Sequence, residues 1–526
     1  MLKTIDLFAG AGGLSFGFEA SNEFVIVAAA ENNPNARETY IVNHKEQENI
    51  TMINDVRGYD FKKLAEGKGG IDIVIGGPPC QGFSNANRQK NHIVSMNNSL
   101  VKEYFRAVKE ISPMAFVMEN VAMLASSTHK FYDSYKDHDE IERLGIIKED
   151  DELILADDEY NGFKLMDIFK NHTENDYMVS DELYQLLNVF YKNRTNNNRM
   201  ESFKKKNRKQ IQKMISSFNE ANKYSVPILN EVIEYLEDSN DVCDFLNLGE
   251  YIKFQKAFKL KKELDDNEII YELEQDPKTN KIKAKVQFYT VGDYVKKVVE
   301  DQYYTNSDVL NAIWFGVPQE RRRFIFMGIK KEVCDKENVI LPSGNPEEVV
   351  TVKDAIYDLV KYETVDELAE DLLQVYLKES DLSKYAIKMR KGSKGVKNHI
   401  ITKTRAAAME RFKALKQGEN FHKLSTELKE SYSKPERTQN SVYLRLDYSE
   451  PSGTVINVRK SMWEHPELDR AVSVREAARL QSFPDRFEFK GTKDSQYQQV
   501  GNAVPPLMAE AIAKQLLENL KSSKKE

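Results

Sequence analysis

The sequence of 526 residues has few cysteines and no long apolar run, and both absences narrow the class of protein. Its three cysteines, Cys80, Cys243 and Cys334, are far apart and odd in number. A disulfide framework or a zinc site is therefore disfavoured, and a free thiol suits a reducing cytoplasm. No apolar run approaches the roughly 20 residues that span a bilayer. The first residues lead directly into an expected strand, unlike a signal peptide.

The sequence also lacks an overall excess of positive charge. The net charge is −7, with 40% hydrophobic and 30% charged residues, which fits a soluble globular protein. Positive charge is nevertheless concentrated locally: residues 383–413 contain ten Lys or Arg and one acid, and residues 203–213 contain six and none. Such runs are commonly solvated helix faces, and contact with nucleic acid is the alternative.

Short apolar segments alternate with helical segments in the first 125 residues. Expected strands cover residues 4–8, 24–30, 71–75 and 115–118, and a short element closes at 54–56. Expected helices cover residues 14–20, 35–43 and 100–111. This alternation predicts an α/β fold with a parallel, doubly wound sheet, in which ligands bind at the carboxyl ends of the strands.

The regular pattern breaks after about residue 125, and no internal repeat is present. The predicted organisation is a first part of the core at 1–125, a mostly helical insertion at 126–285 and a second part of the core at 286–330. A smaller mixed domain follows at 331–470, and the chain returns to the core at 471–526 with a last helix at 507–520.

The most informative segment is Gly-Gly-Pro-Pro-Cys-Gln-Gly-Phe-Ser at residues 76–84, directly after an expected buried strand. Two prolines and flanking glycines predict a stiff, exposed turn. A nucleophile is needed at such a position, whereas a cysteine that serves packing is out of place there. The alternative is an ordinary turn at the end of a strand that happens to contain Cys80.

The turn at residues 9–13, Ala-Gly-Ala-Gly-Gly, follows the first strand and suits a cofactor with an adenosyl group, because glycines allow close approach of a ligand. Glu31 can accept hydrogen bonds from a ribose diol, Asp55 can accept from an adenine amino group, and Phe8 offers an aromatic face. No phosphate-binding lysine follows the glycines. A nucleoside without phosphates, such as S-adenosylmethionine, therefore fits better than NAD or ATP.

Cys80 needs activation or a coupled acid, and Glu119 follows the next strand of the expected sheet. A carboxyl group enclosed by apolar walls should have a raised pKa and can donate to a ring nitrogen. Arg321 and Arg323, two residues apart, would point the same way if extended and could hold a carbonyl oxygen. Cysteine, glutamate and arginine together suit addition to an electron-poor pyrimidine.

With these residues in place, the chain resembles the bacterial DNA (cytosine-5) methyltransferases. The matching blocks, in the order of the family, are residues 6–13, 76–84, 119–121, 319–323, 475–485 and 499–504. The resemblance implies a Rossmann-like methyltransferase domain in which Cys80 attacks C6 of a flipped-out cytosine. It also implies that Glu119 holds N3 and the exocyclic amine, and that Arg323, with Arg321, holds the base and orders the Cys80 loop.

The resemblance further implies S-adenosyl-L-methionine as cofactor, with S-adenosyl-L-homocysteine as product and no metal. The expected cofactor-binding residues are Phe8, Gly10, Ala11, Gly12, Gly13, Glu31, Asn32, Asp55, Val56, Pro79, Leu100, Asn502 and Val504. Residues 331–470 occupy the place of the family's target-recognition domain. The implied partner is double-stranded DNA, bound by a monomer in the bacterial cytoplasm at the nucleoid, with a cognate restriction endonuclease or other defence proteins.

The long insertion departs from the family, which usually has a short connection between the segments that match 119–121 and 319–323. Helical decoration of the catalytic domain is the expectation, and extra DNA contact or a docking surface is the alternative. Two rival functions also stay open: an RNA cytosine-5 methyltransferase and an inactive DNA-binding scaffold. The Cys-Phe-Thr signature of the tRNA-modifying branch is absent, and Cys80, Glu119, Arg321, Arg323 and Asn502 are intact.

Overall fold

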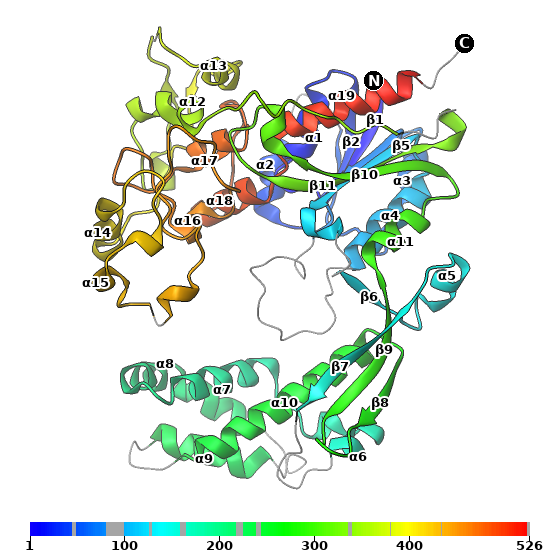
Figure 1. Ribbon diagram of the computed structural model, residues 1–526, viewed down its shortest axis with the longest axis vertical. Helices are drawn as coiled ribbons and strands as arrows, with labels where there is room; N and C mark the ends of the chain where they lie inside the picture. The colour runs from blue at the N-terminus through cyan, green and yellow to red at the C-terminus, as the bar shows by residue number, and fades with distance from the viewer. Residues whose placement is uncertain are drawn as a thin grey trace. The chain divides into compact units, whose positions relative to one another are not determined.

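The computed structural model describes residues 1–44, 49–79, 99–125, 129–157, 165–216, 225–237, 243–334, 339–378, 380–432 and 434–522. These residues form two compact units (Figure 1). Unit 1 contains the described residues of 1–79, 99–125 and 295–522, and unit 2 contains those of 129–294. Residues 331–470, which the sequence suggests as a domain of their own, are grouped with unit 1 by their contacts.

The centre of unit 1 is a seven-stranded sheet in the order β10-β11-β5-β4-β1-β2-β3. Its five strands from the first 125 residues are parallel to one another, and β11 and β10 add an antiparallel edge. The predicted doubly wound fold is therefore confirmed, and the antiparallel strands β11 and β10 extend it at one edge. The strands are β1 (Leu2–Leu7), β2 (Phe24–Ala30), β3 (Thr51–Ile53), β4 (Ile73–Gly76), β5 (Ala115–Val121), β10 (Tyr303–Asn311) and β11 (Arg322–Lys330).

Helices cover both faces of this sheet (Figure 1). On one face α1 (Gly13–Glu19) packs with α19 (Pro506–Ser522), and their apolar side chains share a core with β4 and β5. On the other face α4 (Ser99–Ile111) buries residues at helical spacing, and Phe105 meets Phe116 of β5 and Phe326 of β11 edge to face. Helices α2 (Pro34–Asn43) and α3 (Phe61–Gly67) connect further strands of this sheet. Helix α11 (Val291–Lys297) spans the point in the chain where unit 2 ends and unit 1 resumes.

Strand β5 continues further than the sequence suggests. The apolar run was expected to end at Glu119, but β5 extends to Val121 because β11 pairs with its last residues, with Ile325 opposite Glu119 and Arg323 opposite Val121. A partner strand more than 200 positions later along the chain supplies these backbone hydrogen bonds, so local hydrophobicity could not reveal them. Glu119 therefore lies on a strand, where its backbone is held on one side by β11.

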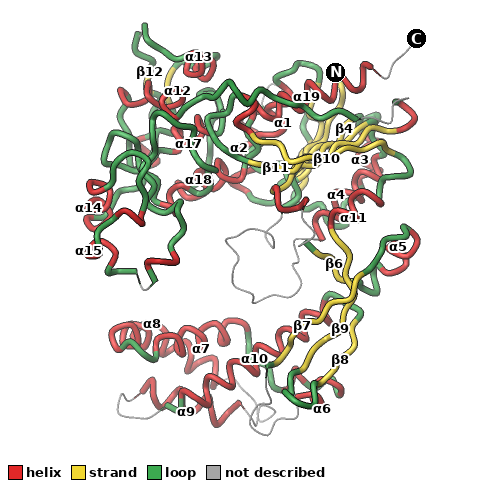
Figure 2. The backbone as a smooth tube through the Cα atoms, in the orientation of Figure 1, coloured by secondary structure: helices red, strands yellow, loops and turns green. Residues whose placement is uncertain are grey.

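The C-terminal part of unit 1 is built from short elements joined by long loops, as Figure 2 shows. Its core contains Trp463, Leu480 and Phe483, and the buried Arg479 donates to the carboxylates of Asp485 and Asp358. The elements are α12 (Val352–Ile356), β12 (Gln374–Val375), α13 (Lys384–Arg390), β13 (Gly395–Val396), α14 (Ala406–Ala414), α15 (Thr426–Lys429), α16 (Val458–Ser461), α17 (Val474–Leu480) and α18 (Lys493–Asn502).

Unit 2 contains an antiparallel sheet as well as helices, and β9 (Ile282–Thr290) pairs with each of its other strands. The sequence did not predict these strands, because charged residues alternate with apolar ones and pair across the sheet, as Glu152 does opposite Lys285. The other strands are β6 (Lys130–Tyr132), β7 (Glu149–Ala156) and β8 (Tyr271–Gln275). The helices are α5 (His138–Arg143), α6 (Leu165–Lys170), α7 (Asp181–Asn193), α8 (Asn197–Ser216), α9 (Ser225–Glu237) and α10 (Phe245–Asp266).

Aromatic and aliphatic side chains from α7 to α10 and from the sheet share one core in unit 2, which includes Leu187, Phe190, Phe258 and Val286. Among the described helices of both units, none combines the length and the apolar character that crossing a lipid bilayer requires.

Candidate active site

Residues singled out in the sequence gather where the parallel strands of unit 1 end. Phe8 follows β1, Glu31 follows β2, Asp55 comes two residues after β3, and Gly77 follows β4. Neighbouring strands run in register, with Leu7 opposite both Ala30 and Gly76. Because these strands are parallel, their carboxyl ends share one edge of the sheet, where α/β sheets bind ligands.

The glycine turn after β1 is joined directly to the end of β2. The Gly10 backbone N–H donates to Glu31 Oε2 at 2.9 Å, and the Asn33 N–H donates to Glu31 Oε1 at 2.7 Å. Each carboxylate oxygen keeps a further lone pair for a ligand. Phe8 has a left-handed backbone, with φ of 59°, which turns the chain out of β1 and leaves its ring half-buried. Gly10 is likewise half-buried, Ala11, Gly12 and Gly13 are buried, and Asn32 is exposed.

Asp55 is exposed and forms a bidentate ion pair with Arg57, whose nearest nitrogen lies 2.7 Å away. The hydrogen bonds from the Arg57 side chain lower the pKa of Asp55. The neighbouring Val56 is buried, and its carbonyl accepts from Arg106 of α4 at 2.7 Å. Arg106, which also donates to the Tyr59 carbonyl, thus holds the loop after β3; the sequence carried no signal for this role.

The C-terminal segment packs against the glycine turn. A Cβ atom on Gly13 would lie 2.3 Å from the Val504 carbonyl oxygen, so only glycine fits there without a shift of the backbone. Val504 is buried, whereas Asn502 at the end of α18 is exposed and accepts a hydrogen bond from Gln498 at 2.8 Å. Residues 491 positions apart in the chain therefore form one wall of the expected cofactor site.

Glu119 and Arg323 form an ion pair at the same edge of the sheet. Arg323 Nε lies 2.8 Å from Glu119 Oε1, and both side chains are largely buried. Burial raises the pKa of Glu119, and the cationic Arg323 and Arg321 only partly oppose that shift. Glu119 can consequently keep a proton at a pH where an exposed glutamate has lost it.

The backbone that leads to Cys80 runs beside Glu119. A Cβ atom on Gly77 would lie 2.8 Å from Glu119 Oε2, so glycine permits this close approach. Asn120 Nδ2 donates to the Pro78 carbonyl at 3.1 Å and holds the turn to β5. Pro79 and Leu100 are half-buried. Cys80 itself lies outside the described residues.

Arg321 was expected to hold the target cytosine together with Arg323, but its guanidinium group points toward the C-terminal segment. It is 1% exposed and donates to three backbone carbonyls, those of Val455, Gly501 and Ala503, at 2.9–3.0 Å. The two arginines do not act as one pair because Arg321 precedes β11 and faces the C-terminal segment. Arg321 therefore joins β11 to the segment that carries Asn502 and Val504.

Two buried glutamines reinforce this junction and were not singled out as site residues. Gln319 Nε2 donates to Gln481 Oε1 at 2.9 Å, and its Oε1 accepts from the Val455 N–H. Gln481 in turn donates to the Val500 carbonyl at 2.7 Å. The blocks at 319–323, 475–485 and 499–504 are thus joined by side-chain hydrogen bonds, although each lies far from the others in sequence.

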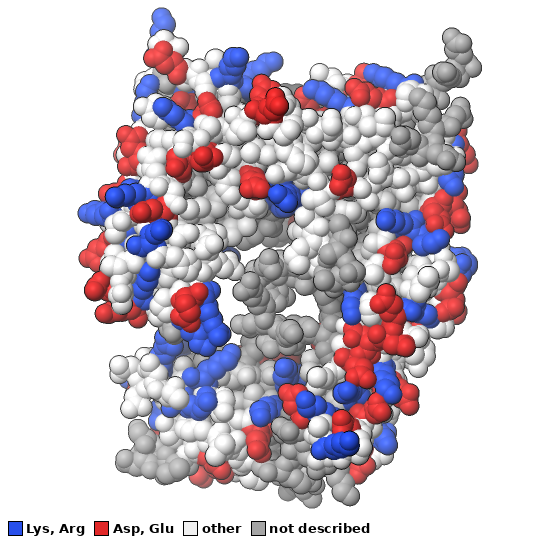
Figure 3. Space-filling view, in the orientation of Figure 1, with Lys and Arg blue, Asp and Glu red and all other residues white. Residues whose placement is uncertain are grey.

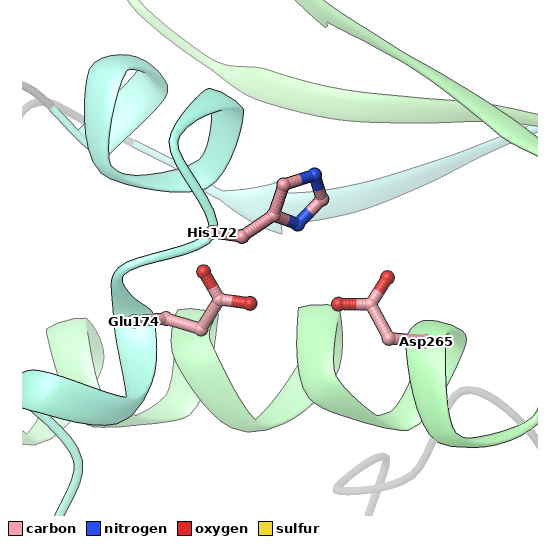
Figure 4. Close-up of side chains that lie close together, drawn as sticks. All are labelled: His172, Glu174 and Asp265. Carbon is pink, nitrogen blue, oxygen red and sulfur yellow. The ribbon is translucent and has the colours of Figure 1, made fainter.

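Unit 2 contains the one group among the described residues with the spacing of a metal site. His172, Glu174 and Asp265 turn toward one another between α10 and the loop after α6 (Figure 4). The buried Lys261 ammonium lies 2.7 Å from both Glu174 Oε1 and Asp265 Oδ2. A lysine thus supplies the positive charge that these carboxylates need, and the group is an ion-pair network around the buried Lys261.

Comparison with known proteins gives a consistent picture. The sequence model of the family described as C-5 cytosine-specific DNA methylase matches residues 2–147 and 280–518, which leaves 148–279 outside the match. Type II methyltransferase M.DdeI of Desulfomicrobium norvegicum is 26% identical over 98% of this chain and 88% of its own length. Type II methyltransferase M.XorII of Xanthomonas oryzae pv. oryzae is 25% identical over 98% and 85%. A solved structure described as a DNA modification methyltransferase encoded within an E. coli prophage shares the fold, with a TM-score of 0.54, 20% identity and coverage of 99% of this chain and 100% of that chain.

Proposed function

The chain belongs to the C-5 cytosine-specific DNA methylase family, and on this premise we propose that it methylates C5 of a cytosine flipped out of double-stranded DNA, with Cys80 as the nucleophile. The observation that carries the proposal is the buried Glu119, ion-paired with Arg323 at 2.8 Å and next to Gly77 of the segment that leads to Cys80. An acid with a raised pKa beside a cysteine-bearing turn suits addition of a thiolate to a pyrimidine ring.

In this mechanism the Cys80 thiolate adds to C6 of the cytosine, and the C5–C6 π electrons become available at C5. Glu119 holds a proton for N3 as negative charge develops on the ring, because its raised pKa favours the protonated form. Arg323 fixes the carboxyl group in position through its 2.8 Å contact. After C5 has taken the methyl group, loss of the C5 proton to a base and departure of the thiolate restore the aromatic ring, and N3 returns its proton to the Glu119 carboxylate.

S-adenosylmethionine is the proposed methyl donor, and bound in the site it would supply a methyl group activated on a positively charged sulfur. The glycine turn, with Phe8 and the Glu31 carboxylate, fits its nucleoside part, and Glu31 has lone pairs left for a ribose diol. We assign the remaining contacts to the other cofactor residues named from the sequence. Asp55 would accept a hydrogen bond from the adenine amino group while it keeps its ion pair with Arg57.

We propose that residues 331–470 read the target sequence and that the protein acts as a monomer on DNA in a restriction-modification system with a cognate endonuclease. The names and the full-length coverage of the Type II methyltransferases support this role. Within the basic segment 383–413, Lys388, Lys391 and Lys394 are exposed and suit phosphate contacts. Arg390 does not, because it is buried and its guanidinium lies 2.6 Å from Asp358.

Bisulfite sequencing of DNA from cells that express the protein tests the function and reveals the target. We expect fully methylated cytosines at one recurring sequence with the wild-type protein and none with Cys80→Ser, because a hydroxyl is a far poorer nucleophile near neutral pH. Methylation by the serine variant at the wild-type level would exclude the covalent mechanism. Methylated RNA with unmethylated DNA would favour the RNA-modifying rival.

A further inference from the structure

Positive charge in unit 2 is concentrated on one helix. Residues 192–213, which include most of α8, contain nine Lys or Arg and a single acid, Glu201. The sheet of the same unit is rich in acids, as in the run Glu149–Ala156 of β7. Figure 3 shows Lys and Arg gathered over the end of unit 2 that carries α8, and Asp and Glu crowded over its strands.

The helical period sorts the residues of α8 into two faces. Met200, Phe203, Ile211 and Ile215 are buried and pack in the core of unit 2, where α8 contacts α7 and α9. The opposite face presents the α8 stripe, defined as Arg199, Lys206, Lys209 and Lys213, and all four side chains are exposed. Their spacing of seven, three and four residues places them in one row about 21 Å long, at 1.5 Å per residue.

Several other lysines of unit 2 are ion-paired, in contrast to this stripe. Lys283 pairs with Glu152 at 2.6 Å, Lys285 with Glu274 at 2.8 Å, and Lys262 with Asp266 at 2.9 Å. By contrast, none of the four stripe residues has an ion pair with another residue in the part of the chain that the structure describes. The acid on α8 lies elsewhere on the helix, 3.8 Å from Lys204.

The unpaired row has an energetic consequence for the helix. Like charges three or four positions apart repel and destabilise a helix, so a face that serves only solubility usually mixes both signs. Among the described residues, no acid forms an ion pair that would offset this repulsion. An external polyanion would remove it, and the negative charges of duplex DNA follow one another at about 1.7 Å along the helix axis.

We propose that the α8 stripe binds the phosphate backbone of double-stranded DNA and adds affinity without reading the sequence. The proposal rests on the proposed function, which makes DNA the substrate. Lysine is well suited to this role because its ammonium contacts phosphate as a point charge from a flexible stem. The stripe lies within residues 148–279, the segment outside the family match, so it would add a contact to those made by the matched segments.

The test compares two triple variants of the full-length protein that lose the same charge from the same unit. Lys206, Lys209 and Lys213 are changed to Gln in the first, and Lys278, Lys283 and Lys285 in the second, matched control. Binding to a mixed-sequence duplex of about 40 base pairs is measured by fluorescence anisotropy between about 50 and 200 mM salt. Each lost phosphate contact should lower the slope of log affinity against log salt by about 0.9, so the α8 variant should lose roughly 2–3 and the control little.

Further readouts keep the outcomes distinct. The dissociation constant of the α8 variant at about 0.1 M salt should rise at least tenfold, since one lost contact is worth roughly eightfold at that salt. Its melting temperature should be unchanged or higher, because repulsion within α8 is relieved. Its methylated sequence and its rate at saturating DNA should match the wild type. Lys209→Gln alone, expected to lower the slope by about 0.9, serves if the triple variant does not fold.

A wild-type slope in the folded variants would overturn the proposal, and so would equal losses in the α8 and control variants, which would show an effect of net charge alone. Wild-type DNA binding together with loss of binding to an acidic protein would assign the stripe to a protein partner instead. If the wild-type protein methylates no DNA, the proposed function fails, and that result is read separately from the salt slopes.

Discussion

At the residue scale, two effects act on the pKa of Glu119 in opposite directions. Desolvation favours the neutral carboxylic acid, and the guanidinium at 2.8 Å favours the carboxylate. Because desolvation is the larger effect, the pKa of Glu119 is raised. The group can thus change its protonation during addition to the ring and yet keep a fixed orientation, which a general acid requires.

We expect Glu119→Gln to lower the rate of methyl transfer by about 10²–10⁴-fold, because the amide has no proton to share with N3. Single-turnover kinetics with target DNA measures this rate. Glu320→Gln is the control, since Glu320 lies just before β11, the strand that pairs with β5, and is exposed. The Glu119 variant should bind DNA and S-adenosylmethionine about as well as the wild type. If it retained most of its activity, the acid would have to be sought elsewhere.

Arg321 and Arg322 are neighbours with opposite surroundings. Arg321 is buried on three backbone carbonyls, whereas the Arg322 side chain is 67% exposed and its contact with Glu320 is 3.5 Å long. We expect Arg321→Gln to lower the free energy of unfolding by roughly 3–5 kcal/mol, because buried partners lose their donors. Arg322→Gln should change it by no more than about 1 kcal/mol.

Chemical denaturation of the two arginine variants measures this difference. Activity should follow the folded fraction in both, since neither side chain is assigned to the reacting base. A folded and stable Arg321→Gln protein without activity would return Arg321 to the base-binding role that the sequence first suggested.

At the scale of elements, the site depends on how α1 meets the segment between α18 and α19. The backbone of Gly13 lies so close to the Val504 carbonyl that a methyl group would have to displace one of the two segments. The glycine turn and Val504 are both assigned to the cofactor site. Their spacing is therefore set by packing between the two ends of the chain.

We expect Gly13→Ala to weaken S-adenosylmethionine binding at least tenfold and to destabilise the fold by about 1–3 kcal/mol, the usual effect of overpacking. Isothermal titration calorimetry measures the first effect and denaturation the second. Gly453→Ala is the matched control, because a Cβ atom there meets nothing within 4 Å. Equal affinities of the two variants would remove the contact with Val504 from the cofactor site.

At the scale of the whole molecule, unit 2 has its own sheet and its own core. The sequence placed the end of the insertion at residue 285, but β9 continues to Thr290 and pairs with β6, β7 and β8. A deletion that ended inside β9 would leave an unpaired strand edge, which favours aggregation. Residues 129–290 are therefore the segment to remove, and α11 stays whole.

We expect a variant in which a flexible Gly/Ser linker replaces residues 129–290 to methylate the same target sequence as the full chain. Its DNA affinity should fall and should depend less on salt, because the α8 stripe is lost. Bisulfite sequencing and anisotropy measure these effects. A folded deletion variant that methylated a different sequence would overturn the assignment of recognition to residues 331–470.

Local sequence patterns were enough to predict the sheet of alternating strands and helices, the position of the glycine turn and Glu31 at strand ends, the place of Glu119 near the end of a strand and the presence of an insertion. These features could be predicted because strand periodicity, turn residues and short motifs are local properties of the chain. The residues at the carboxyl edge follow from them, since parallel strands end at a common edge.

Which polar groups meet depends on the folded chain. Arg321 donates to carbonyls 134–182 positions away. Asn120 donates to the Pro78 carbonyl, and Arg390 donates to the Asp358 carboxylate. The extension of β5 along β11 and the charged strands of unit 2 have the same origin. A buried donor pairs with the acceptor that the fold brings within about 3 Å, and that choice depends on the packing of distant elements, which no local pattern contains.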